Sequence, residues 1–164
     1  NADRAYNAYR RALAITVEDA IPNERELIRR LEELLARVQK WPELVTIYDD
    51  VVARADDDDL RRDTLIKRAR LLEDGIGDTA GAVDGWREVV LATESNPAAV
   101  HPYREAVAEL ERLYRARGQW RELVDLFESR LARSAHPNET AELRLKLAEL
   151  FEVQLQDLAS AIDQ

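Results

Sequence analysis

The side chains most able to do chemistry in this sequence are its carboxylates and its two histidines. The chain of 164 residues has 33 Asp and Glu, two His and no Cys, so cysteine nucleophiles and thiolate metal sites are excluded. A catalytic acid and base need a sheltered pocket that perturbs their pKa values, and no motif here predicts one. We therefore expect no enzyme activity and no catalytic residue.

Both histidines precede a proline, as His101-Pro102 and His136-Pro137. A residue before proline is disfavoured in the helical region, so each His is interpreted as a helix entrance. A metal site would need a second ligand close by, and the two lie in different parts of the chain. No glycine-rich phosphate loop is present either, so we expect no metal and no cofactor.

A run of four aspartates, Asp56 to Asp59, has the residue type of a calcium ligand but not its pattern. A calcium loop alternates its acidic residues around a central Gly and ends on Glu, whereas this run continues directly into Leu60. Acidic residues at a helix N-terminus cap it and interact favourably with its dipole. The run is therefore predicted to cap a helix.

The overall charge narrows the possible partners. The formal net charge is −9, and the Arg pairs at 10–11, 29–30 and 61–62 each have acidic neighbours, so a nucleic acid is not expected as partner. A helical repeat of the RNA-processing type stays as an alternative that this charge disfavours. No run of about 20 apolar residues exists, and membrane insertion is not expected.

The elements that must position these side chains are helices. The sequence is 46% hydrophobic and 35% charged with only five Gly and five Pro, a balance typical of α proteins. A self-match at a spacing of 79 residues places 31–54 on 110–133 and 69–84 on 148–163, and a looser match recurs about every 39 residues. This period is typical of solenoids built from helical hairpins.

Apolar residues at three-and-four spacing predict about nine helices, the last one incomplete. Pro42 suits the start of one of them. Three tryptophans, Trp41, Trp86 and Trp120, fall on packing positions and are interpreted as core residues. The expected helices are at 3–18, 24–39, 42–55, 58–74, 78–93, 102–117, 120–134, 137–154 and from 157.

These repeats resemble the tetratricopeptide repeat (TPR) family. Leu147-Ala148-x-x-Phe151 fits the first helix of its hairpin, Ala82-x-x-x-Trp86 fits the second, and Gly118 two residues before Trp120 fits the turn. The resemblance implies an all-α, right-handed α-solenoid of antiparallel helix pairs over 1–164. Its parts would be a half repeat at 3–18, repeats at about 24–55, 58–93 and 98–134, and a truncated repeat at 137–164.

The chain also departs from the family pattern. Leu44 and Leu123 replace a small Ala, and Glu32 and Glu111 stand where Gly or Ala would let helices approach closely. Larger residues at these positions are expected to widen the helix packing.

By the resemblance, the chain is a protein–protein interaction scaffold or adaptor whose first helices line a concave face. The family's clamp for a C-terminal carboxylate uses Lys and Asn, which this face lacks, so a receptor for such tails is disfavoured. The alternative is a structural spacer that binds nothing through the groove. The positions implied for the concave face are Arg29, Glu33, Arg37, Asp63, Arg70, Glu73, Glu105, Arg112, Arg115, Glu142, Glu149 and Glu152.

The chain opens with no leader-like or targeting segment, which favours the cytoplasm and indicates a piece of a longer protein. Its basic residues are almost all Arg, with Lys only at 40, 67 and 146, a bias typical of GC-rich bacterial genes. Incomplete repeats at the two ends would leave apolar faces uncovered, so end-to-end self-association is expected.

Overall fold

The computed structural model describes residues 24–94, 96 and 99–154, together with the single positions 7, 11 and 162. The chain divides into two compact units, Asn1–Ala92 and Thr93–Gln164. No residue in the described ranges lies in a β-strand, and the expected all-α class is confirmed.

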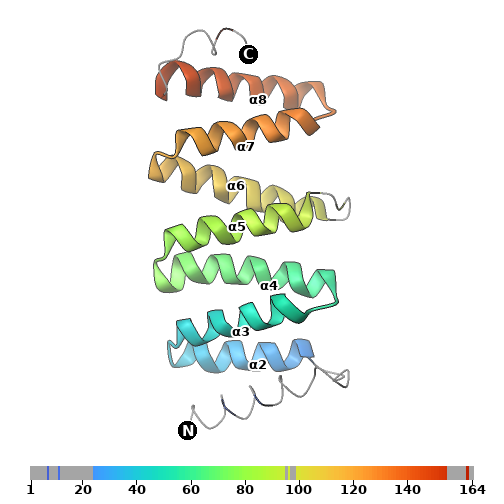
Figure 1. Ribbon diagram of the computed structural model, residues 1–164, viewed down its shortest axis with the longest axis vertical. Helices are drawn as coiled ribbons and strands as arrows, with labels where there is room; N and C mark the ends of the chain where they lie inside the picture. The colour runs from blue at the N-terminus through green and yellow to red at the C-terminus, as the bar shows by residue number, and fades with distance from the viewer. Residues whose placement is uncertain are drawn as a thin grey trace. The chain divides into compact units, whose positions relative to one another are not determined.

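Unit 1 is built from antiparallel helices that follow one another along the chain (Figure 1). A π-helical turn, η1, extends the third of them directly. The elements are α2 (Glu24–Arg37), α3 (Trp41–Arg54), α4 (Asp58–Arg70), η1 (Leu71–Ile76) and α5 (Thr79–Thr93), whose last residue begins unit 2.

Unit 2 has the same arrangement, with one antiparallel helix pair and the first helix of a second pair. Its elements are α6 (Val100–Arg117), α7 (Trp120–Arg133), α8 (Pro137–Glu149) and a second π-helical turn, η3 (Leu150–Gln154). The two π-helical turns begin 79 residues apart, as the sequence repeat requires.

The described residues hold seven α-helices against about nine expected, because the helices expected at 3–18 and from 157 lie outside the described residues except for single positions. Several helix ends differ from the expected ones by one or two residues, and one of these differences changes an interpretation. α6 begins at Val100, so His101 is inside its first turn rather than before it. A proline in the first turn is tolerated because its missing N–H would have no partner there, and Pro102 takes that place. His136 does precede its helix, with extended φ and ψ of −104° and 120°.

The turns between paired helices show how closely the two units repeat. Gln39 and Gly118 occupy the same position and both have left-handed φ, 53° and 66°. The residues that follow, Lys40 and Gln119, have φ and ψ of −87° and 65° against −84° and 66°. The 79-residue repeat is therefore a repeat of backbone geometry at this turn.

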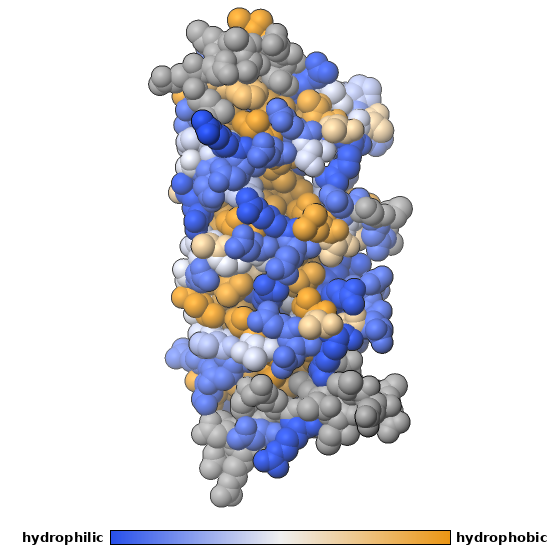
Figure 2. Space-filling view, viewed as in Figure 1, coloured by the Kyte–Doolittle hydropathy of each residue, from blue (hydrophilic) through white to orange (hydrophobic). Residues whose placement is uncertain are grey.

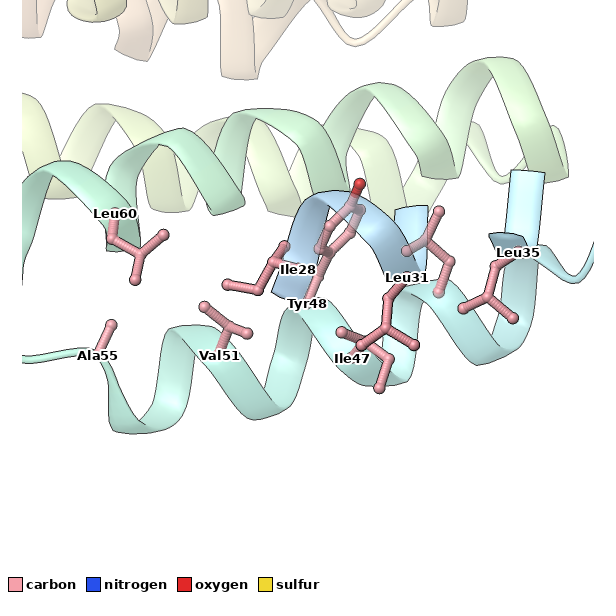
Figure 3. Close-up of a cluster of buried hydrophobic side chains, with 9 residues drawn as sticks. Ile28, Leu31, Leu35, Ile47, Tyr48, Val51, Ala55 and Leu60 are labelled. Atoms are coloured by element: carbon pink, nitrogen blue, oxygen red, sulfur yellow. The ribbon is translucent and has the colours of Figure 1, made fainter. Parts of the chain in front are cut away.

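The core of unit 1 is an apolar cluster between α2, α3 and the start of α4 (Figure 3). Leu31 and Val51 have no exposed surface, and burial of such a side chain stabilises the fold by about 1.5 to 3 kcal/mol. The cluster consists of Ile28, Leu31, Leu35, Leu44, Ile47, Tyr48, Val51, Ala55 and Leu60. Unit 2 buries Val107, Leu110, Leu113, Tyr114, Leu123, Val124, Phe127, Leu143, Leu147 and Leu150.

Close packing of α4 on α5 depends on a glycine. A Cβ atom at Gly85 would lie 3.0 Å from the Cβ and 3.2 Å from the Cα of Ala69, closer than side chains normally pack. Two small residues thus let the backbones approach. The next residue, Trp86, is buried with 1% of its surface exposed, as expected of a core tryptophan.

The other two tryptophans are only half-buried. Trp41 and Trp120 begin α3 and α7 at equivalent positions, and the Trp41 ring lies 3.5 Å from where a Cβ at Gly75 would stand. The core interpretation therefore holds in full for Trp86, while Trp41 and Trp120 pack at the edge of their units.

Candidate functional site

A hollow in unit 2 lies between α6 and α8 and has a volume of about 670 Å³. Its α6 wall is a single stripe, because residues three and four apart lie on the same face of a helix. The lining residues are Val100, Tyr103, Arg104, Val107, Ala108 and Glu111 from α6, Arg130 from α7, and His136, Asn138, Glu139 and Glu142 at and after the start of α8.

The hollow has an apolar base and a charged rim. Val107 is buried with 4% of its surface exposed, while Arg104 and Glu142 are exposed on opposite walls. On the face drawn in Figure 2, hydrophilic residues likewise surround smaller areas of hydrophobic surface. Apolar centres with polar rims are the usual anatomy of protein interfaces.

An ion pair replaces apolar packing at one end of this hollow. Arg130 of α7 donates to Glu139 of α8 over 2.9 Å, and the Ser134 hydroxyl donates to the same carboxylate over 3.3 Å. The equivalent positions in unit 1 are Val51 and Leu60, both members of the buried cluster. These two positions on the hollow are thus core positions in unit 1.

A second ion pair ties the two walls together. Lys146 of α8 donates to Glu111 of α6 over 3.0 Å, and its ammonium lies 5.2 Å from the centre of the Phe127 ring. A cation over an aromatic face is attracted to it. This pair fixes the spacing of α6 and α8.

Unit 1 has the equivalent pair, in which Lys67 donates to Glu32 over 2.8 Å. Tyr48 stands in place of the phenylalanine, and its hydroxyl donates to Glu32 over 3.2 Å. Burial, together with the adjacent Glu32 charge, raises the pKa of Tyr48, so it stays a donor at neutral pH. The sequence repeat marked both glutamates as departures, but it did not predict that they bridge alternate helices.

The run of aspartates in unit 1 caps α4, as predicted. Asp57 accepts hydrogen bonds from the backbone N–H groups of Asp59 over 2.9 Å and Leu60 over 3.2 Å. Its carboxylate also accepts from Arg25 of α2 over 2.8 Å, and this bond holds the pKa of Asp57 below its usual value. Asp63 lies at 3.7 Å from the same guanidinium.

In unit 2 the residues at the positions equivalent to Arg25, Asp57 and Asp63 form no corresponding ion pairs within the described ranges. Arg104 replaces Arg25, His136 replaces Asp57 and Glu142 replaces Asp63. His136 makes no side-chain cap to α8. Within the described ranges neither Arg104 nor Glu142 has an ion-pair partner, and both line the hollow.

The positions implied for the concave face differ in their surroundings. Arg29 pairs with Glu26 over 2.7 Å and with Glu33 on its own helix. Arg112 and Arg115 also pair within their helix, with Glu109 over 2.7 Å and Glu111 over 3.2 Å respectively. Two of the twelve positions are placed by their contacts, since Glu142 lines the hollow in unit 2 and Asp63 lies near Arg25. Three others are exposed, namely Arg37, Glu149 and Glu152. Two more are half-buried, namely Glu73 and Glu105.

Arg70 lines a smaller hollow in unit 1, of about 440 Å³, beside the Lys67–Glu32 pair. Trp41, Tyr48 and Gly75 also border it. The unit 2 hollow includes Arg104, Val107 and Ala108, which the sequence did not single out, although the stripe of three-and-four spacing along α6 was readable.

Among the described residues, no group of three His, Cys, Asp or Glu side chains is arranged to hold a metal ion. None of their helices combines the length and apolar composition needed to cross a bilayer.

Paired antiparallel helices that recur along the chain define a helical-repeat fold. Residues 106–142, which run from α6 through α7 into α8, match the model of the tetratricopeptide repeat family. The expected resemblance is thereby confirmed. Repeats of this class generally mediate protein–protein interactions, and their fold is typically non-catalytic.

Two solved structures share the fold. They are the nearly identical TPR-like repeats of a candidate kinesin light chain from Podosopora anserina and a single-substitution variant of the same protein. Each is 23% identical and covers 99% of this chain and 84% of that one, with TM-scores of 0.53 and 0.54. No curated protein matches the sequence.

Proposed function

We propose that this chain is a protein-interaction module that binds a peptide segment of a partner protein in the hollow between α6 and α8. The observation that carries the proposal is the 670 Å³ hollow itself, with its buried Val107 base. Its volume lies within the roughly 300 to 1,000 Å³ typical of ligand sites. The net charge of −9 favours a protein over a nucleic acid as partner.

The comparison between units supports this choice of site. Unit 1 fills the equivalent positions with Val51 and Leu60, whereas unit 2 places the Arg130–Glu139 ion pair there. An ion pair stabilises a fold less reliably than packed hydrocarbon of the same volume. Retaining it beside an open hollow is consistent with a surface kept for a ligand.

The test is a selection of displayed random peptides on the whole chain, followed by affinity measurements on two matched variants. Ala108→Arg fills the hollow from an exposed position of α6, and Ala116→Arg adds the same side chain to the same helix outside it. We expect peptide affinity to fall at least about tenfold with Ala108→Arg and to stay unchanged with Ala116→Arg. Peptides indifferent to both would contradict the proposal.

The wider concave face remains part of the proposal, and a second candidate function competes with it there. Arg112 and Arg115 are each paired within α6, which suits a spacer whose surface charges satisfy one another. Reversing both to Glu separates the two functions. Reduced affinity for the selected peptides supports binding along the face, while unchanged affinity with intact stability confines binding to the hollow.

A further inference from the structure

The two units differ in the carboxylate nearest to one arginine. In unit 1, the Arg25 guanidinium lies 2.8 Å from Asp57 and 3.7 Å from Asp63, so Asp57 is its closer partner. In unit 2, Arg104 stands at the equivalent position of α6, but the equivalent of Asp57 is His136. Unit 2 has thus kept the arginine and, as Glu142, the more distant acid, but it has lost the closer one.

The loss leaves the rim of the hollow incompletely satisfied. Arg104 makes no ion pair with any described residue, and His136 provides no side-chain cap to α8. Of the three glutamates that line this hollow, Glu111 accepts from Lys146 and Glu139 accepts from Arg130, while Glu142 makes no ion pair with any described residue. An arginine beside open space favours a carboxylate because its planar fork matches two oxygens.

We propose that this hollow receives the carboxylate of an Asp or Glu side chain from the bound peptide, with Arg104 as its principal partner. The peptide carboxylate then lies beside Arg104 as the Asp57 carboxylate lies beside Arg25 in unit 1. This inference rests on the proposed function, because it names the chemistry of the peptide in that same hollow. The apolar base at Val107 contacts the hydrocarbon part of the ligand's side chains.

The first experiment uses the displayed random peptides described above. We expect peptides whose binding is blocked by Ala108→Arg to be enriched in Asp or Glu relative to the unselected library. Replacing the enriched acid by its amide lowers affinity about tenfold or more. Arg104→Gln produces a similar loss, while Arg121→Gln, an exposed arginine of α7 outside the hollow, produces none.

A double-mutant cycle then links the two groups. In the Arg104→Gln protein, amidation of the peptide acid should have little further effect, because the interaction is already absent. Peptides blocked by Ala108→Arg but indifferent to Arg104→Gln would overturn this inference and leave the proposed function standing. Peptides enriched in basic residues and dependent on Glu142 would overturn it equally. The absence of any peptide blocked by Ala108→Arg would overturn both.

A second variant supplies the missing acid from the chain itself. His136→Asp recreates the arrangement of Asp57 in unit 1, so we expect a higher Tm and about tenfold weaker peptide binding. His136→Asn is the matched control, because Asn caps helices nearly as well as Asp but carries no charge. It should raise the Tm and weaken peptide binding clearly less than His136→Asp does. Equal affinity for the His136→Asp and His136→Asn proteins would overturn the inference.

Discussion

The two units place different chemistry on the same backbone. In unit 1, Val51 and Leu60 belong to the buried apolar cluster between α2, α3 and α4. In unit 2 the equivalent Arg130 and Glu139 form a 2.9 Å ion pair beside a hollow of about 670 Å³. Two substitutions therefore exchange buried apolar packing for an ion pair at the rim of a hollow, without a change of helix order.

The comparison also shows what stays constant when a repeat diverges. The bridges Glu32–Lys67 and Glu111–Lys146 are retained, as are the left-handed turn residues Gln39 and Gly118. These features keep the same helix bridges and turn geometry in both units, while two of the positions that differ, Val51/Arg130 and Leu60/Glu139, line the hollow in unit 2.

The largest expected effects come from equivalent core leucines. Leu31→Ala in unit 1 and Leu110→Ala in unit 2 remove side chains with 0% and 1% exposure, and each should lower the free energy of unfolding by about 2 to 5 kcal/mol. Denaturant unfolding followed by circular dichroism measures both. Leu145→Ala, at a position 62% exposed, is the control and should change stability little. A large loss for only one of the two buried leucines would break the equivalence of the units.

A smaller effect distinguishes the helix caps. Asp57→Ala removes a carboxylate that caps α4, and should cost about 1 kcal/mol. His136→Ala, at the equivalent position, removes no cap and should change the free energy of unfolding by less than about 0.5 kcal/mol. Thermal melts of the two variants sharpen the comparison. Equal losses would mean that His136 has a stabilising contact of its own.

Most of the helix positions and turns could be predicted from the sequence, because helix periodicity and the 79-residue repeat both follow from the spacing of residues along the chain. The Asp57 cap was predictable for the same reason. The hollow was not, since it depends on how the side chains of α6, α7 and α8 fill a shared volume. One indication was nevertheless present in the sequence, because the residues 79 positions after Val51 and Leu60 are Arg130 and Glu139. A charged pair at two positions that are apolar in the other repeat indicates that these positions are not packed in a core.

The smallest expected effect concerns acid stability in unit 1. Hydrogen bonds from Arg29, and then Arg30, lower the pKa of Glu26 to about 2. Because the pKa of Glu26 is lower in the folded protein, its ionised carboxylate contributes its full stabilisation at pH values above its ordinary pKa of 4.5. This contribution is lost as the pH falls toward 2. Glu26→Gln should therefore lower the Tm slightly at pH 7 and make no difference at pH 2. A Tm difference that persists at pH 2, or survives 1 M salt, would contradict the ionic origin.

The bridges between neighbouring helices have a consequence for the speed of folding. Arg25–Asp57, Glu32–Lys67 and Glu111–Lys146 join residues 32 or 35 positions apart, and Glu94–Arg133 joins residues 39 apart. Each of these ion pairs therefore closes a short loop of chain. The conformational entropy lost on closing such a loop is small. Proteins dominated by such near-neighbour contacts reach their native state in roughly microseconds to milliseconds. Each unit can accordingly begin to fold from its own helical hairpin as soon as that hairpin is made.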